Sequence, residues 1–271
     1  MTLLSKAIWI TAALPAILLG AVVEGERAGE VRVVPVERTP EPETVEIKIA
    51  FPRQGELETD NPMTIQLRLE AYGLGVITPL PRNKEIRDSK QGQAVHFIID
   101  GRPYLSVNEA IDEMSETEEI DYDQTINIKL PYKLQDGEHV LRVFPVRSYD
   151  ECLKGPDVFE ACTFFVGQRK PTLSVDLSMP YITYNQPQGE FDGKQPILLD
   201  FFVKNTQLSK DGYKVRLTID RTDKRLLTEW SPFYIYGLKR GSHTIKLELL
   251  DQHDKVIKPL FNDLERTIVV R

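Results

Sequence analysis

Histidines and an acidic stretch are the residues of this chain that could bind a metal ion. His96 stands four residues before Asp100, and Asp121 and Asp123 end an acidic stretch that covers residues 109–123. Imidazole nitrogens and carboxylate oxygens are common ligands of zinc and calcium. His96, Asp100, Asp121 and Asp123 are therefore the candidate metal site. The stretch lacks the features of an EF-hand loop, so a solvent-exposed helix and loop is its ordinary interpretation.

A group of aromatic residues in the C-terminal half could stack against sugar rings. It comprises Trp230, Tyr234 and Tyr236, together with Tyr181 and Tyr184 further upstream. Alternation along an extended chain sends Trp230, Tyr234 and Tyr236 to one face. A row of rings on one face is suited to carbohydrate binding, and packing in a core is the alternative interpretation.

The two cysteines, Cys152 and Cys162, flank one predicted hairpin loop. Two thiols exclude a disulfide-rich scaffold and an all-thiolate zinc site. Outside the cytoplasm a disulfide between them would be chemically permitted. Strand pairing about residues 152–153 would place Cys162 near Phe144 instead, so the sequence leaves both a disulfide and two free thiols open.

Sequence motifs of catalytic centres are absent from the chain. There is no G-x-S-x-G, no phosphate-binding glycine loop and no H-E-x-x-H. The many carboxylates include no pair that the sequence alone places across a cleft. We therefore expect a non-catalytic protein without a cofactor.

The composition is that of a folded, acidic protein. The 271 residues carry a formal net charge of −7, and 41% of them are hydrophobic and 28% charged. This length has room for two domains of ordinary size. Nucleic-acid-binding surfaces need clustered Lys and Arg, and the sequence has no run of four basic residues. We expect no nucleic-acid partner.

The N-terminal region has the composition of a targeting segment. Residues 7–23 contain no charged side chain, Lys6 precedes them and Glu24 follows. The run is at the short limit for a membrane span and slightly long for a signal-peptide core. The flanking charges place the N-terminus in the cytoplasm and the remainder outside. Residues 1–25 are therefore expected to be a signal peptide or membrane anchor, and the Pro/Glu-rich residues 26–44 an extended tether.

From residue 45 onward the hydrophobic pattern has a period of two, which predicts β-strands. The predicted strands cover residues 45–50, 64–71, 94–100, 125–130, 139–146, 161–166, 172–177, 197–204, 214–220, 226–230, 243–250 and 266–270. A helical pattern is present only at residues 107–115.

The C-terminal parts of the two halves are copies of one another. Residues 132–166 match residues 236–270 without a gap. The match aligns His139 with His243, each two residues after a glycine. A histidine that recurs in two separate modules is better explained as part of the scaffold than as a metal ligand.

The repeated segment resembles bacterial immunoglobulin-like and fibronectin-III-like domains. Its L-x-x-G-x-H motif, at Leu134–His139 and Leu238–His243, leads into a strand and a closing hairpin, and His96–Gly101 forms a related upstream strand. The resemblance implies an all-β fold of two tandem Ig-like β-sandwiches: residues 45–168, with the acidic insert, and residues 169–271. It specifies a fold but no activity.

These observations together predict a non-catalytic binding or spacer protein of the cell envelope, periplasmic or otherwise extracytoplasmic. Residues 7–23 would hold it near a membrane, and its partner would be another envelope protein, because strand edges and loops are the natural contact surfaces of this fold. Two alternatives remain. One is a carbohydrate- or cell-wall-binding module that uses the aromatics around Trp230, and the other is an exported metal-binding protein centred on His96.

Overall fold

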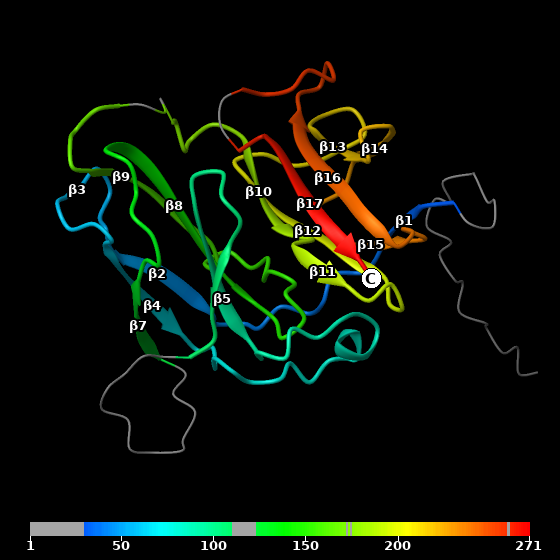
Figure 1. The fold of residues 1–271 in the computed structure, drawn as a ribbon, viewed down its shortest axis with the longest axis horizontal. Helices are drawn as coiled ribbons and strands as arrows, with labels where there is room; N and C mark the ends of the chain where they lie inside the picture. Colours follow the sequence, from blue (N-terminus) through cyan, green and yellow to red (C-terminus); the bar gives the residue numbers. More distant parts are fainter. Residues whose placement is uncertain (1–29, 110–122, 172, 174, 259–260) are drawn as a thin grey trace, which may run out of the picture. The chain divides into compact units, whose positions relative to one another are not determined.

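A computed structural model describes residues 30–109, 123–171, 173, 175–258 and 261–271 (Figure 1). Within these residues the protein is all-β with four sheets, and its helical structure is limited to a 3₁₀ helix, η1 (Pro81–Lys84). No helix in this part of the chain is long and apolar enough to span a membrane. The predicted anchor, residues 7–23, lies outside the described residues.

Two of the sheets belong to the first half of the chain and enclose one hydrophobic core. The smaller sheet has the order β2 (Glu46–Phe51), β4 (Thr64–Glu70), β7 (Gln124–Lys129). The larger has the order β3 (Leu57–Glu58), β9 (Glu160–Val166), β8 (Gly137–Val146), β5 (Ala94–Ile99), β6 (Leu105–Val107). Alternate residues such as Leu67, Ile126 and Val143 fill the space between them, as two packed sheets require.

The other two sheets enclose a second core built largely from the C-terminal half. One has the order β1 (Arg32–Pro35), β15 (Phe233–Tyr236), β12 (Ile197–Lys204), β10 (Tyr181–Gln186). The other has the order β11 (Gly189–Phe191), β17 (Asp263–Val270), β16 (Gly241–Leu250), β13 (Lys214–Ile219), β14 (Asp223–Leu227). Leu199, Leu217 and Leu247 are fully buried between these sheets. Four sheets with two cores are consistent with two β-sandwiches.

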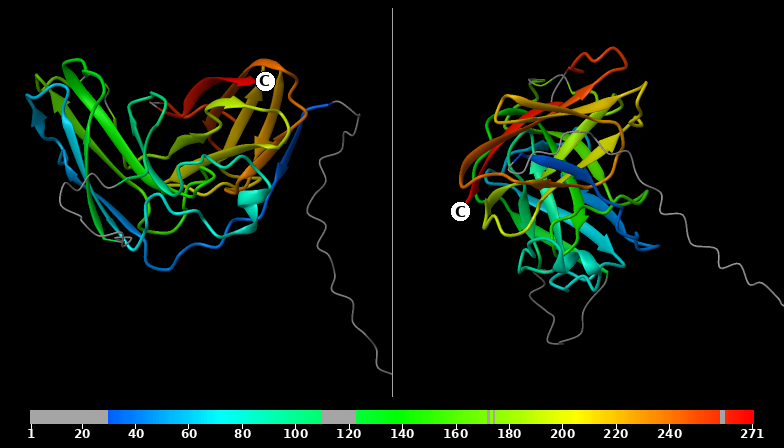
Figure 2. Two further views of the ribbon diagram at one scale, coloured as in Figure 1. Left: turned by 60° about the horizontal axis from the view of Figure 1, so that its bottom comes forward. Right: turned by 90° about the vertical axis from the view of Figure 1, so that its right-hand side faces the viewer.

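Strand β1 comes from the segment whose composition predicted an extended tether. It pairs antiparallel with β15, placing Val33 opposite Ile235, and the amide of Val36 donates to Pro232 O at 2.9 Å. Figure 2 shows this blue strand beside the second pair of sheets. Val33 packs against the second core, and Pro35 ends an edge strand, where proline is tolerated. Within the predicted tether, Arg32–Pro35 is therefore part of a sheet rather than free chain.

Other predicted elements also differ from the structure. The described residues of segment 172–177 lie in no strand, and the predicted helix at 107–115 begins at the end of β6, with residues 110–115 outside the described part. Strand β10 had no period-two signal because all six of its residues are buried. A strand covered on both faces has no polar side to alternate with.

The sequence repeat corresponds to an equivalent hairpin in each half. Strands β8 and β9 pair with His139 opposite Phe164, and β16 and β17 pair with His243 opposite Ile268. The two registers coincide residue for residue, because Phe164 and Ile268 are also partners in the sequence match.

Candidate functional site

The two repeated histidines hold equivalent positions near the start of strands β8 and β16. His139 Nδ1 lies 2.8 Å from Asp100 Oδ2, and its Nε2 lies 2.8 Å from Gln135 O. In the second copy His243 makes the same contacts, at 2.7 Å, with Asp220 Oδ2 and Lys239 O. Carboxylate and carbonyl oxygens only accept hydrogen bonds, so both ring nitrogens donate in each copy. This geometry favours the doubly protonated imidazolium in each copy.

The electrostatics agree with this protonation state. Burial alone would lower the pKa of His139, but the bonds to Asp100 and to Gln135 O outweigh it and raise the pKa above its usual value. The pKa of His243 is raised for the same reasons. Asp100 also accepts from the amide of Val140 at 3.0 Å. The Asp100–His139 pair thus connects the turn after β5 to strand β8, so its role is structural.

His96 was the centre of the predicted metal site, but its neighbours in the structure are not the predicted acidic ligands. Its ring is fully buried and stacks on Tyr104, with 3.7 Å between ring centroids. Nδ1 lies 2.8 Å from Asn185 Oδ1, and Nε2 lies 3.6 Å from Asp150 Oδ1. His96 therefore links β5 of the first sandwich to β10 of the second.

The remaining candidate metal ligands do not join His96. Asp100 is bonded to His139, and Asp123 Oδ1 accepts from the amide of Ala71 at 2.9 Å. Asp121 lies outside the described residues. Within the described part of the chain, no three His, Cys, Asp or Glu side chains are grouped so that they could hold a metal ion.

A buried ion pair joins the loop after β8 to strand β12 of the second sandwich. Lys154 Nζ lies 2.5 Å from Asp200 Oδ1, and both side chains are fully buried. Asp200 Oδ2 accepts from the amide of Cys152 and from Asn185 Nδ2, each at 2.8 Å. Burial alone would raise the pKa of Asp200, but Lys154 and the other donors outweigh it and hold the pKa below its usual value. These satisfied hydrogen bonds are what a buried pair needs to be tolerated.

A second buried pair fixes the chain that follows β1. Arg82 Nη1 lies 2.5 Å from Glu151 Oε2, and Thr39 Oγ1 donates to the same oxygen at 2.8 Å. Arg82 also donates to Glu37 O, and Arg147 donates to Pro40 O at 2.7 Å. Residues 37–40 are therefore held by hydrogen bonds to the first sandwich. Strand β1, just before them, pairs with a strand of the second sandwich. This arrangement and the Lys154–Asp200 pair connect the two sandwiches at several points.

The two cysteines form no disulfide, and both thiols are free and buried. Cys152 Sγ lies 3.3 Å from Lys154 Nζ, whereas Cys162 lies in β9, with its Sγ 3.5 Å from Pro52 O. Burial raises the pKa of Cys152 well above its usual value and that of Cys162 to about 12. Their separation follows from the register of β8 and β9, which places Cys162 opposite Leu141.

The candidate sugar-binding aromatics do not form an exposed platform. Tyr181, Tyr184 and Tyr234 are buried. Trp230 precedes β15, so the alternation of that strand does not govern it, and its Nε1 donates to Phe201 O at 2.8 Å. Tyr236 is partly buried beside Arg32. These rings pack in the cores and at the contact between the sandwiches.

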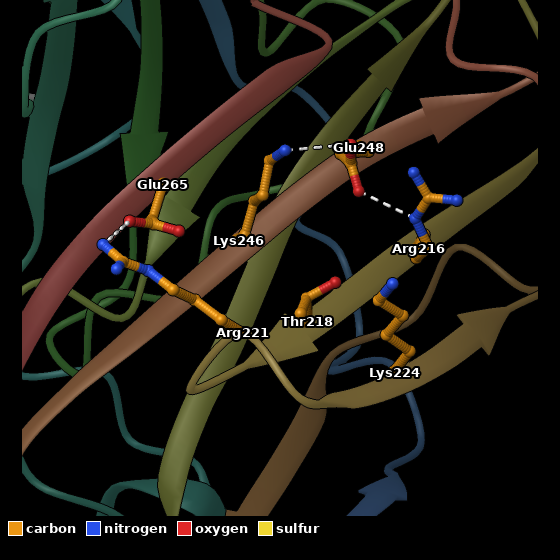
Figure 3. Close-up of a pocket in the computed structure, with 7 residues that line it drawn as sticks. All are labelled: Arg216, Thr218, Arg221, Lys224, Lys246, Glu248 and Glu265. Atoms are coloured by element: carbon orange, nitrogen blue, oxygen red, sulfur yellow. Dashed lines mark hydrogen bonds and ion pairs between the residues drawn. The ribbon is translucent and has the colours of Figure 1, made fainter.

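An exposed hollow of about 270 Å³ lies on the outer face of the β17–β16–β13–β14 sheet. Figure 3 shows its lining side chains, which are Arg216, Thr218, Arg221, Lys224, Lys246, Glu248 and Glu265. They share one face because alternate residues of a strand point the same way, while Ile245 and Leu247 of β16 point into the core. The sequence pattern predicted the strands here but did not single out these charges, because partners on four strands meet only after folding.

Ion pairs bind most of the charges in this hollow to one another. Glu248 accepts from Arg216 Nε at 2.7 Å and from Lys246 Nζ at 3.0 Å. The bond to Arg216 is the main reason that the pKa of Glu248 is lowered. Arg221 pairs with Glu265 at 3.4 Å. The side chain of Lys224, by contrast, has no hydrogen-bond or ion-pair partner in the described part of the chain (Figure 3).

Comparisons with known proteins assign this chain to no family. No family model and no curated protein matches the sequence. Among solved structures, the chain is similar to fibronectin(III)-like modules of Clostridium thermocellum CbhA, with 15% identity over 83% of this chain and 94% of that one and a TM-score of 0.25. A chimeric titin Z1Z2 tandem matches with 10% identity over 83% and 97% of the two chains and a TM-score of 0.22.

A third similar structure is the glucan-utilization protein SGBP-B of Bacteroides ovatus, solved in complex with a mixed-linkage heptasaccharide. Its identity is 16% and its TM-score 0.20, and the match covers 83% of this chain but only 47% of that one. The four sheets and their two cores define an all-β protein, consistent with two β-sandwiches.

Proposed function

We propose that this chain is a non-catalytic protein of the cell envelope whose two sandwiches act as one body and bind another envelope protein. The observation that carries the proposal is the fully buried Lys154–Asp200 pair between the sandwiches. A buried pair of this kind resists opening, because separating the charges leaves each one unpaired in an apolar interior. The sandwiches thus present fixed outer faces, which suits recognition of a partner.

The position of β1 refines the proposed attachment to a membrane. If residues 7–23 are the anchor, the connection to the second sandwich is only residues 24–31, because β1 begins at Arg32. An extended chain covers at most about 3.5 Å per residue, so this linker reaches roughly 28 Å.

The two alternative functions find less support in the described residues. Carbohydrate binding would need a surface other than the rings around Trp230, since Tyr181, Tyr184 and Tyr234 are buried. Metal binding would need ligands other than His96 and Asp100, which bond to different partners.

Site-specific photo-crosslinking in intact cells of the source organism tests this proposal. A photoreactive residue replaces Thr222, in the turn before β14 of the second sandwich, or Arg68 on the exposed side of β4, both of which are exposed. We expect the full chain in the membrane fraction, accessible from the extracytoplasmic side, and a discrete adduct with an envelope protein from one of these faces. A cytoplasmic location, or no adduct from either face, would overturn the proposal.

A further inference from the structure

Strand β14 combines three features on the outer side of the second sandwich. Among the residues that the structure describes, it ends its sheet and pairs with β13 alone. Its outward residues, Lys224 and Leu226, are two positions apart and both exposed, Leu226 by 51%. The hollow with its four basic side chains and two carboxylates begins beside Lys224.

The charges of the hollow favour an acidic ligand at the β14 side. Thr218 pairs with Lys224 on one side and with Lys246 on the other, so these cations lie in one row across the sheet. Lys246 is already held by Glu248 and by Asp263. Lys224 is the cation in this row without an internal partner in the described part of the chain. A carboxylate of a bound ligand would give the Lys224 ammonium group an ion-pair partner.

The open edge favours an extended ligand. An edge strand offers backbone N–H and C=O groups that a further strand can use. Charged residues on an edge often serve to prevent such pairing, and Lys224 alone would fit that role. The half-exposed Leu226 beside it does not fit that role, because an apolar side chain favours association at a sheet edge whereas a polar one would hinder it.

We propose that β14 and the adjoining hollow bind an acidic, extended segment of a protein partner by strand addition. One carboxylate of that segment faces Lys224, and an apolar side chain two residues away faces Leu226, since side chains two apart share a face. The inference rests on the proposed function, whose partner it describes. The partner segment would therefore carry an acidic residue, then any residue, then an apolar residue (acidic–x–apolar).

A defined peptide tests the inference on the full chain. The probe is an eight-residue peptide in which Glu and Val alternate along one face and Thr occupies the other. The control peptide carries Lys in place of Glu. We expect the acidic probe to bind, with amide chemical-shift changes at Asp223–Leu227, and to weaken as salt is raised. Equal binding of both peptides, or shifts confined to other strands, would overturn the inference.

Matched variants locate the contact. Lys224→Glu replaces attraction with repulsion at an exposed site, so we expect affinity to fall about fivefold or more. Lys129→Glu is the control, because Lys129 is likewise exposed on a strand, β7, that ends its sheet in the first sandwich. Far-ultraviolet circular dichroism verifies that both variants fold. An equal effect of the two substitutions, or no effect of Lys224→Glu, would contradict the proposal.

The two proposals fail in distinguishable ways. An envelope adduct whose partner site lacks an acidic–x–apolar segment, together with no binding of the acidic probe, leaves the proposed function intact and refutes strand addition at β14. Binding of the probe to a chain found only in the cytoplasm refutes the envelope function and retains the peptide site.

Discussion

Lys154 and Asp200 form a fully buried ion pair, with 2.5 Å between Nζ and Oδ1, although they belong to different sandwiches. Asn185 and the amide of Cys152 satisfy the second carboxylate oxygen. The pair therefore links three separate parts of the chain: the loop after β8, β10 and β12. Its removal is the most direct way to test how firmly the two sandwiches are joined.

Replacing one partner of this pair is expected to destabilise the protein strongly. Lys154→Met leaves the Asp200 carboxylate buried without its cation, which costs about 3–5 kcal/mol of unfolding free energy. The double variant Lys154→Met/Asp200→Leu removes both charges and should recover a large part of the loss. Chemical denaturation of the three proteins measures this. A double variant no more stable than the single one would contradict the account.

Strand β1 is expected to stabilise the second sandwich. A chain beginning at residue 37 lacks β1, whereas one beginning at residue 31 retains it and serves as the control. Loss of the β1 pairing exposes the edge of β15, so we expect amide exchange at Phe233–Tyr236 to accelerate about tenfold or more. Hydrogen exchange read by mass spectrometry reports this. Unchanged protection of β15 in the shorter chain would show that β1 contributes little.

The imidazolium of His139 predicts a pH dependence of stability. Its folded-state pKa is raised above the usual 6.5, with burial opposing the charge and the bond to Asp100 favouring it. The stabilisation is therefore fully present below about pH 6.5 and is lost as pH rises through the folded-state pKa.

Denaturant unfolding between about pH 6 and pH 9 checks this sign. His139→Gln should reduce the fall in unfolding free energy, because the glutamine does not titrate. His253→Gln, at an exposed position, is the control and should keep it. A steeper fall in His139→Gln than in the unmodified protein would refute the assigned protonation.

Both thiols are expected to be unreactive in the folded protein. Burial raises the pKa of Cys152 and of Cys162, so little thiolate is available to react. A thiol reagent should label neither residue at neutral pH until denaturant is added, after which it labels both. Protection of both thiols in the denatured, non-reduced protein would instead reveal a disulfide.

The hydroxyl of Tyr184 predicts a neutral or stabilising substitution. This side chain is fully buried, and its Oη has no hydrogen-bond partner among the described residues. Tyr184→Phe removes an unsatisfied polar atom and retains the ring, so stability should be unchanged or increase by about 1 kcal/mol. Tyr72→Phe is the contrasting variant, because Tyr72 donates to Val146 O at 3.0 Å and should lose stability. Thermal unfolding of both variants separates the cases.

Features that depend on neighbouring residues could be predicted from the order of amino acids alone. Period-two alternation identified strands such as β4 and β16, because one face of each is buried and the other is not. The gap-free repeat identified His139 and His243 as equivalent, and the structure places each at the same position of its strand, with an aspartate as the equivalent partner. Both patterns can be read from the order of the residues, without knowing which distant segments meet in the fold.

Only the tertiary structure decided which distant segments meet. Arg32–Pro35 pairs with a strand some two hundred positions away, and its proline-rich surroundings indicated an extended chain but no partner. His96 lies against Asn185 and not Asp100, and the aromatic rings near Trp230 face other parts of the protein rather than solvent. Composition records the type of each side chain, whereas burial and ion pairing depend on the surfaces that fold against it. The fold class was therefore predictable from the sequence, whereas the contact between the two sandwiches and the charged hollow were not.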